Sequence, residues 1–187
     1  DEHWEMMLTC LRKHTTIVFL FNAGETDSVK EDRLLLKLLT HQRHQGKSWR
    51  DIFFVLNRCD LLFQDSDEPL AFINKKETLR QRVSKHVKNV FAQEGHPTIY
   101  TLSSLPMMCG EILFWNYDAL SNDDKEYLLS QSSDWINRFL SDAKCEQFPS
   151  SAKKWTYRHV QLFRHEMLNF TYYNTFLNGL RTHLSIR

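Results

Sequence analysis

Two nearly continuous apolar runs constrain the fold of this chain more than any other feature. They occupy residues 15–22 and 51–57, and both are rich in β-branched and aromatic residues. A strand with one wet face alternates apolar and polar residues, whereas neither run alternates. Continuous runs of this kind are typical of strands whose two faces are both covered by helices in a parallel sheet. We therefore predict two buried strands, and a weaker run at 98–103 predicts a third.

Helical patterns separate the three runs. Residues 29–44 repeat leucine at helical spacing, and residues 73–93 place leucine, valine and phenylalanine along one stripe. The second pattern stops at Gly95, with Pro97 behind it, which is a typical C-terminal signal of a helix. The order strand, helix, strand, helix, strand predicts two crossover connections. The expected fold is therefore α/β, with a parallel sheet and flanking helices.

The second half of the chain has a different pattern. Beyond residue 107 the sequence is wholly helical in character, and a last long helix is predicted from about residue 153 to 183. We divide the chain into an α/β domain at residues 1–150 and a helical C-terminal extension at residues 151–187.

Net charge and cysteine content narrow the choice of binding partners and of cellular compartment. The formal net charge is +1, so no global charge favours nucleic acid, and we expect none as a partner. The four cysteines form no C-x-x-C pair and suit neither a zinc site nor a dense disulfide framework. A reducing, cytoplasmic location is the simplest interpretation. No apolar run approaches the roughly 20 residues that a membrane-spanning helix needs.

The turn Asn57-Arg58-Cys59-Asp60 carries the clearest chemical signal. It follows the second predicted strand, and ligands of open parallel sheets bind at the carboxyl ends of the strands. A carboxylate there can accept hydrogen bonds from both the N1–H and the exocyclic amine of guanine. Adenine lacks that pair of donors and would leave Asp60 unpaired. Arg58 can stack its planar guanidinium on the base, and Asn57 can bridge the base to neighbouring loops.

The four-residue pattern is short, and its context gives it weight. With that context the sequence resembles the dynamin-like family of large GTPases. Residues 17–23, 53–62 and 99–104 match, in order and spacing, the last three strands of that family's GTPase domain. Residues 174–184 look like the helix that leads from this domain into the stalk. The resemblance therefore implies a partial P-loop GTPase-type sheet.

The resemblance also implies roles for individual residues. Asn57, Arg58 and Asp60 would contact the guanine of GTP or GDP, while Ser103 and Ser104 would form the loop near its carbonyl. Arg58 replaces the usual lysine and Ser104 the usual alanine. These two differences bear on the affinity for guanine more than on the specificity for it. The complete protein would bind and hydrolyse GTP, self-associate through its GTPase domain and remodel membranes, with peripheral membrane contact.

The phosphate-binding half of a GTPase site does not occur in the sequence. A GTPase needs the loop G-x-x-x-x-G-K-[ST] and ligands for Mg²⁺. Gly46-Lys47-Ser48 looks like the end of that loop, but His41 stands where its first glycine belongs, and a helix precedes it. We expect Mg²⁺ only in the complete protein and no GTP hydrolysis by this chain alone. The first strand is also expected to lie at an unpaired sheet edge, where a neighbouring strand belongs.

Two other interpretations stay open. The chain could be a pseudo-GTPase or protein-interaction scaffold that uses this fold without hydrolysis. It could also be an α/β domain that binds no nucleotide, in which Asn57 and Asp60 only cap a turn. A strand followed by a phosphate loop, directly upstream of residue 1, would favour the GTPase over the scaffold.

Overall fold

Three parallel strands form the centre of the protein in a computed structural model, which describes residues 16–24, 28–63 and 69–185. They are β1 (Ile17–Asn22), β2 (Ile52–Asn57) and β3 (Ile99–Thr101), in the order β1-β2-β3. This confirms the predicted α/β class and parallel sheet. The register pairs Asn22 with Asn57, so the carboxyl ends of β1 and β2 lie side by side. The first fifteen residues of the predicted α/β domain lie outside the described part.

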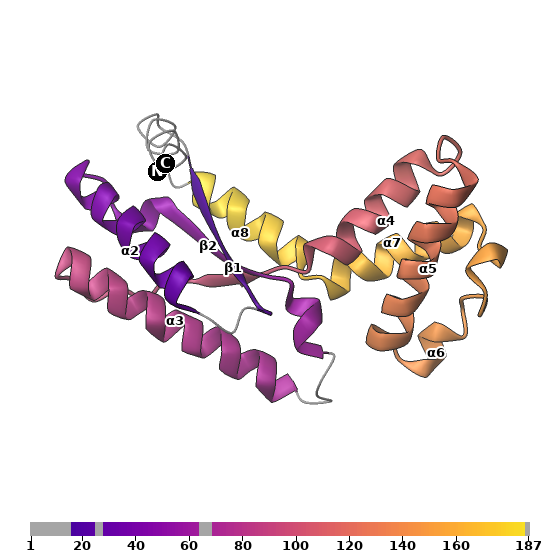
Figure 1. The fold of residues 1–187 in the computed structure, drawn as a ribbon, viewed down its shortest axis with the longest axis horizontal. Coiled ribbons are helices and arrows are strands. Elements are labelled where there is room, and N and C mark those ends of the chain that lie inside the picture. Colours follow the sequence, from indigo (N-terminus) through magenta and orange to yellow (C-terminus); the bar gives the residue numbers. More distant parts are fainter. Residues whose placement is uncertain (1–15, 25–27, 64–68, 186–187) are drawn as a thin grey trace.

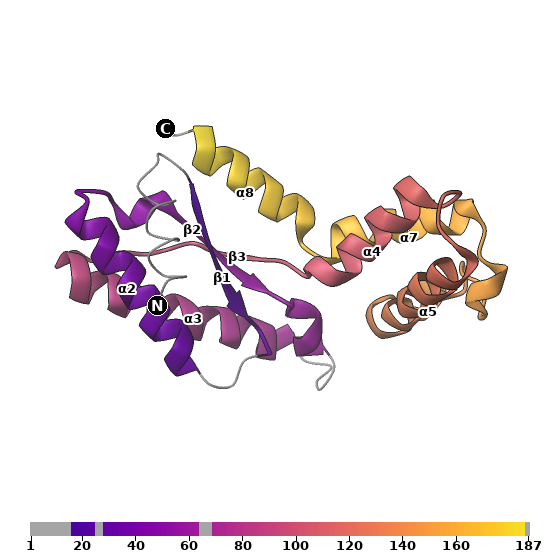
Figure 2. The same cartoon turned by 45° about the horizontal axis from the view of Figure 1, so that its top comes forward.

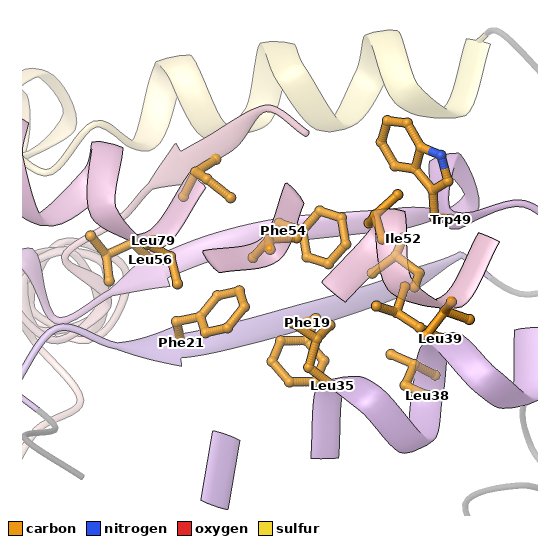
Figure 3. Close-up of a cluster of buried hydrophobic side chains, with 14 of the residues drawn as sticks. Phe19, Phe21, Leu35, Leu38, Leu39, Trp49, Ile52, Phe54, Leu56 and Leu79 are labelled. Atoms are coloured by element: carbon orange, nitrogen blue, oxygen red, sulfur yellow. The ribbon is translucent and has the colours of Figure 1, made fainter. Parts of the chain in front are cut away.

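Helices α2 (Ser28–His44) and α3 (Pro69–Phe91) make the two crossovers and cover the same face of the sheet (Figures 1 and 2). Strand β2 is flanked by two short 3₁₀ turns, η1 (Trp49–Asp51) before it and η2 (Cys59–Phe63) after it. Figure 3 shows the core between the sheet and α2, where side chains of alternate strand residues meet leucines of the helix. Its fully or nearly buried members include Phe19, Phe21, Phe54, Leu56, Leu35, Leu38 and Leu39.

Five of the remaining elements gather at one end of the elongated molecule (Figure 1): α4 (Ser104–Asn116), α5 (Asn122–Phe139), α6 (Asp142–Cys145), η3 (Ala152–Lys154) and α7 (Tyr157–Phe170). The last helix, α8 (Tyr173–Ser185), lies along the sheet. Helices α4, α5 and α7 share a second apolar core. Phe148 and Trp155 pack together in it, with ring centroids 5.1 Å apart. The domain boundary that we placed at residue 150 therefore falls inside one packed cluster.

The single long helix predicted over residues 153–183 is wrong. The chain forms α7 and α8 instead, and between them Tyr172 adopts a left-handed conformation with φ of 60°. After this break α8 turns back along the sheet and covers the face opposite α2 and α3 (Figure 2). Phe53 of β2 is 1% exposed and packs edge-on against Phe176 of α8. The C-terminal helix is thus a layer of the α/β fold.

Strand β1 lies at an edge of the described sheet, as expected. It is not buried on both faces, however, because Val18 is 42% exposed and Leu20 is 56% exposed. Helix α8 contacts β3, and its side chains reach β2, so among the described helices α8 covers mainly these two strands on this face. Only β2 has the two covered faces that its sequence predicted, with every residue from Ile52 to Leu56 buried.

Candidate functional site

The predicted site residues meet where β2 and β3 end. The Leu102 N–H donates to the Leu56 carbonyl at 2.9 Å, which extends the β2–β3 pairing beyond β3. The Cys59 N–H then donates to the Leu102 carbonyl at 3.3 Å. These backbone bonds hold the turn 57–60 beside the loop 102–104. The structure therefore brings together the two segments that the sequence placed at one nucleotide base.

Asn57 joins the turn to its neighbours on both sides. Its carbonyl accepts a hydrogen bond from the Ala23 N–H at 2.9 Å, after the end of β1. Its side-chain Oδ1 accepts one from the Ser104 N–H at 3.2 Å, at the start of α4. This is the bridging position predicted for the asparagine, although here both partners are protein groups.

The chain reverses at Arg58. This residue has a φ of 60°, in the left-handed region that non-glycine residues adopt only rarely, and its side chain is exposed. The next residue, Cys59, is fully buried, and burial raises its thiol pKa to about 12. A thiol that stays neutral is a poor nucleophile. Cys59 therefore fills the core beneath the turn, while Arg58 lies free to contact a ligand from solvent.

Asp60 is a buried carboxylic acid with an unpaired oxygen. Its residue is 5% exposed, and Oδ1 has no hydrogen-bond partner among the described residues. Burial raises the pKa of Asp60 above its ordinary value. Its own backbone N–H, the charge of Arg58 and the nearby Ser103 hydroxyl each oppose that rise. The Ser103 hydroxyl still makes no hydrogen bond of normal geometry in the described part of the chain.

Asp60 and Ser103 therefore present two nearby buried polar atoms that no described residue satisfies with a hydrogen bond of normal geometry. Native proteins pair the large majority of buried polar side-chain atoms, so each exception needs a reason. An unpaired buried carboxylate lowers stability, and such strain is often kept where a ligand binds. The arrangement is suited to a ligand that donates hydrogen bonds to Asp60.

Replacing Asp60 with asparagine should stabilise the protein at neutral pH, because the amide has nearly the same shape and no charge to desolvate. The folded-state pKa of Asp60 is raised, so its contribution to stability is complete below the unfolded pKa of about 3.9 and is lost as the pH rises through the folded value. The gain from Asp60→Asn should thus be small at about pH 4 and grow toward neutrality. Urea unfolding across this pH range measures it.

A matched variant separates burial from charge alone. Asp118→Asn changes an exposed carboxylate in the turn after α4, and its effect on stability at neutral pH should be near zero. An Asp60→Asn protein that is less stable than the wild type at pH 7 would contradict the unpaired state of the carboxylate.

Sequence reasoning missed one partner of the site. The Ser103 N–H donates to the carbonyl of Thr171 at 3.1 Å, at the break between α7 and α8. Tyr172 follows Thr171 in the chain. Burial is the main cause that raises the pKa of the Tyr172 phenol, and the nearby Cys59 raises it further. No local signal could have revealed this contact, because Thr171 is far from Ser103 in the sequence and the packing of α7 on α4 brings them together.

The loop near the predicted base carbonyl is already engaged. The resemblance assigns backbone N–H groups of this loop to the guanine O6. In the structure the Ser103 N–H donates to Thr171 and the Ser104 N–H donates to Asn57. A base carbonyl could take either donor only by exchanging one of these protein bonds.

No family model matches this chain, and neither the curated proteins nor the solved structures include a match. Within residues 16–24, 28–63 and 69–185, no group of three or more histidine, cysteine, aspartate or glutamate side chains could hold a metal ion. None of the described helices combines the length and the apolar character needed to cross a membrane.

Proposed function

We propose that the turn 57–60 and the serines Ser103 and Ser104 recognise a guanine base. The observation that carries this proposal is the buried, unpaired Oδ1 of Asp60 at the carboxyl end of the central strand. In open parallel sheets this is the end where ligands bind. A guanine offers two parallel N–H donors, which would satisfy the carboxylate oxygens together.

The specificity follows from the charge of Asp60. Hydrogen bonds to a charged group contribute about 1.5–3 kcal/mol each, and a site built around them strongly rejects a base that lacks the donors. Arg58 stacks on the face of the base from its exposed position. Asn57 keeps the turn against the start of α4 and so fixes the carboxylate relative to the base.

Access to the carboxylate lowers the affinity. Asp60 is almost fully buried, and the loop N–H groups are bonded within the protein, so the base binds only after the turn opens. The observed affinity is reduced by the fraction of molecules in that open state. This chain also carries no phosphate loop, so it supplies base recognition without the charge-assisted contacts to phosphate.

The complete protein, in this proposal, is a cytoplasmic dynamin-like GTPase that binds and hydrolyses GTP with Mg²⁺ for membrane remodelling. The support is the resemblance of residues 17–23, 53–62 and 99–104 to the last three strands of that GTPase domain. The parallel order β1-β2-β3, with β1 at an edge of the described sheet, is compatible with a sheet that continues on that side. Peripheral membrane contact and self-association belong to the same proposal.

An Asp60→Asn substitution should change which base is preferred. The wild-type chain is expected to bind GDP at least about tenfold more tightly than ADP, because one charge-assisted hydrogen bond corresponds to at least that factor. The amide of Asp60→Asn can donate to the extra carbonyl of xanthine, so this variant should prefer XDP over GDP. Titration of fluorescent GDP, XDP and ADP into the 187-residue chain measures both ratios.

Asp118→Asn, distant from the turn, should keep the wild-type order of affinities. Equal binding of GDP and ADP, or no saturable binding of either, would overturn guanine recognition. That result would favour the scaffold interpretation, which the internal bonds of the Ser103 and Ser104 N–H groups support.

A further inference from the structure

Helix α4 carries a row of apolar side chains on its solvent side. Leu105, Met108 and Trp115 are exposed, the last of them by 71%, and Ile112 between them is half-buried. These four residues, here called the α4 stripe, follow one another at intervals of three, four and three residues, which places them on one face of the helix. The other side of α4, which includes the fully buried Leu113, packs against α5 and α7. The stripe is therefore an apolar helix face that the described part of the chain leaves largely in solvent.

Trp115 is held in one orientation although it is exposed. Its indole Nε1 donates to Oε2 of Glu111 at 2.7 Å, and Oε1 of the same carboxylate accepts a hydrogen bond from Nε of Arg164 in α7 at 2.7 Å. The Phe114 ring meets the indole edge-on, with centroids 5.0 Å apart. Because the polar atom of the indole is already paired, covering the ring leaves no buried polar group unsatisfied. A fixed, exposed tryptophan of this kind is typical of the anchor residues of protein interfaces.

The spacing and charge of the α4 stripe favour a second helix as its partner. Alternating intervals of three and four residues are the a and d positions of a heptad, the narrow seam along which two helices pack. A helix that lies on a lipid surface carries lysine and arginine on its polar face, whereas the sequence of α4 contains neither. Its one charged residue, Glu111, is neutralised by Arg164 of the same chain. Two such helices can therefore meet without uncompensated like charges.

The α4 stripe has the same spacing when it is read from either end. A two-fold axis that passes between Met108 and Ile112 therefore matches the row to itself in the antiparallel direction. Leu105 then lies opposite Trp115 of a second copy, and Met108 lies opposite Ile112 of that copy. Dimers with two-fold symmetry need a surface patch that is complementary to itself, and this row meets that condition. The antiparallel direction also sets the two helix dipoles against each other, which is favourable.

We propose that two copies of this chain bind each other through the α4 stripe, as an antiparallel pair of helices around a two-fold axis. The inference rests on the proposed function only where it gives a surface to its self-association, and it needs no nucleotide. Stable interfaces contain about 20–30 residues on each side. The stripe has four, so the dimer is expected to be weak and reversible, and to form at high protein concentration.

Sedimentation velocity of the 187-residue chain without nucleotide, from micromolar to millimolar concentration, should show a monomer–dimer equilibrium. Met108 is 52% exposed, so Met108→Glu should still fold, yet it places an unpaired carboxylate in the interface. It should weaken dimerisation at least about tenfold, and Ile112→Lys should act alike through an unpaired ammonium. An equimolar mixture of the two variants should dimerise at least about tenfold more strongly than either alone, because the new carboxylate of one copy faces the new ammonium of the other.

Leu36→Glu adds the same charge at an exposed leucine of α2 and should leave dimerisation unchanged. The proposal is overturned if the wild-type chain stays monomeric at millimolar concentration, if Met108→Glu and Leu36→Glu dimerise equally, or if the mixture is no stronger than the single variants. A wild-type monomer that binds vesicles of phosphatidylcholine and phosphatidylserine, and loses this binding in Met108→Glu, would also overturn it and assign the stripe to lipid. These measurements contain no nucleotide, and the GDP and XDP titrations use dilute, monomeric chain, so either proposal can fail alone.

Discussion

Replacing Phe53 with alanine should lower the free energy of unfolding by about 3–5 kcal/mol, the range for a large aromatic residue removed from a core. Phe53 is 1% exposed in the central strand and stacks on Tyr100. It also packs against Phe176, at 5.8 Å between ring centroids, and against His183 of the same helix. The loss is large because one side chain joins the sheet to α8, and a typical domain has only about 5–15 kcal/mol in total.

Urea unfolding at neutral pH measures this loss. Phe53→Leu is the matched control, because it keeps an apolar side chain of nearly sufficient volume and should cost less than about 1.5 kcal/mol. Phe53→Ala with a cost near that of Phe53→Leu would show that α8 does not cover this face of the sheet in solution.

The sheet was predictable because a strand that is buried on both faces has a continuous apolar run in its sequence. The run at 51–57 is β2, and every residue from Ile52 to Leu56 is buried. The run at 15–22 has the same composition, yet β1 exposes Val18 and Leu20. An apolar run shows that a strand can be covered, whereas the reach of α8 decides which strand is covered.

The break in the last helix could not be predicted for a related reason. Thr171 and Tyr172 interrupt the helical pattern without a glycine or proline, and local propensity therefore gives no stop signal. In the structure the Thr171 carbonyl accepts the Ser103 N–H, and Tyr172 adopts its left-handed conformation beside that contact. Tertiary contacts thus end a helix that its own sequence would have continued.

The candidate site, too, was predictable only in part. The position of Asn57 and Asp60 follows from one rule, that ligands bind at the carboxyl ends of parallel strands, and the structure places them there. The burial of Asp60 and the bonds of the Ser103 and Ser104 N–H groups are tertiary features, since these groups bond to Thr171 at the end of α7 and to Asn57 after β2. Residue type and spacing predict which groups meet, but not which of them the protein has already paired.

Replacing Gly179 with alanine should also destabilise the protein strongly. A Cβ at this position of α8 would lie 2.0 Å from Cε1 of Tyr100, far inside any normal contact. The Tyr100 ring cannot easily turn aside, because it is stacked on Phe53. Overpacking costs about 1–3 kcal/mol, and this clash should fall at the upper end of that range. The expected sign is notable because glycine to alanine inside a helix otherwise gains up to about 1 kcal/mol.

Gly110 of α4 provides the matched control. A Cβ there would meet its nearest neighbour, a carbon of Phe163, at an ordinary 3.5 Å, so Gly110→Ala should be neutral or stabilising. A double-mutant cycle with Tyr100→Ala then isolates the contact, because removing the ring should relieve the clash and give a coupling of at least about 1 kcal/mol. If Gly179→Ala is as stable as Gly110→Ala, or if the cycle shows no coupling, α8 does not lie against β3.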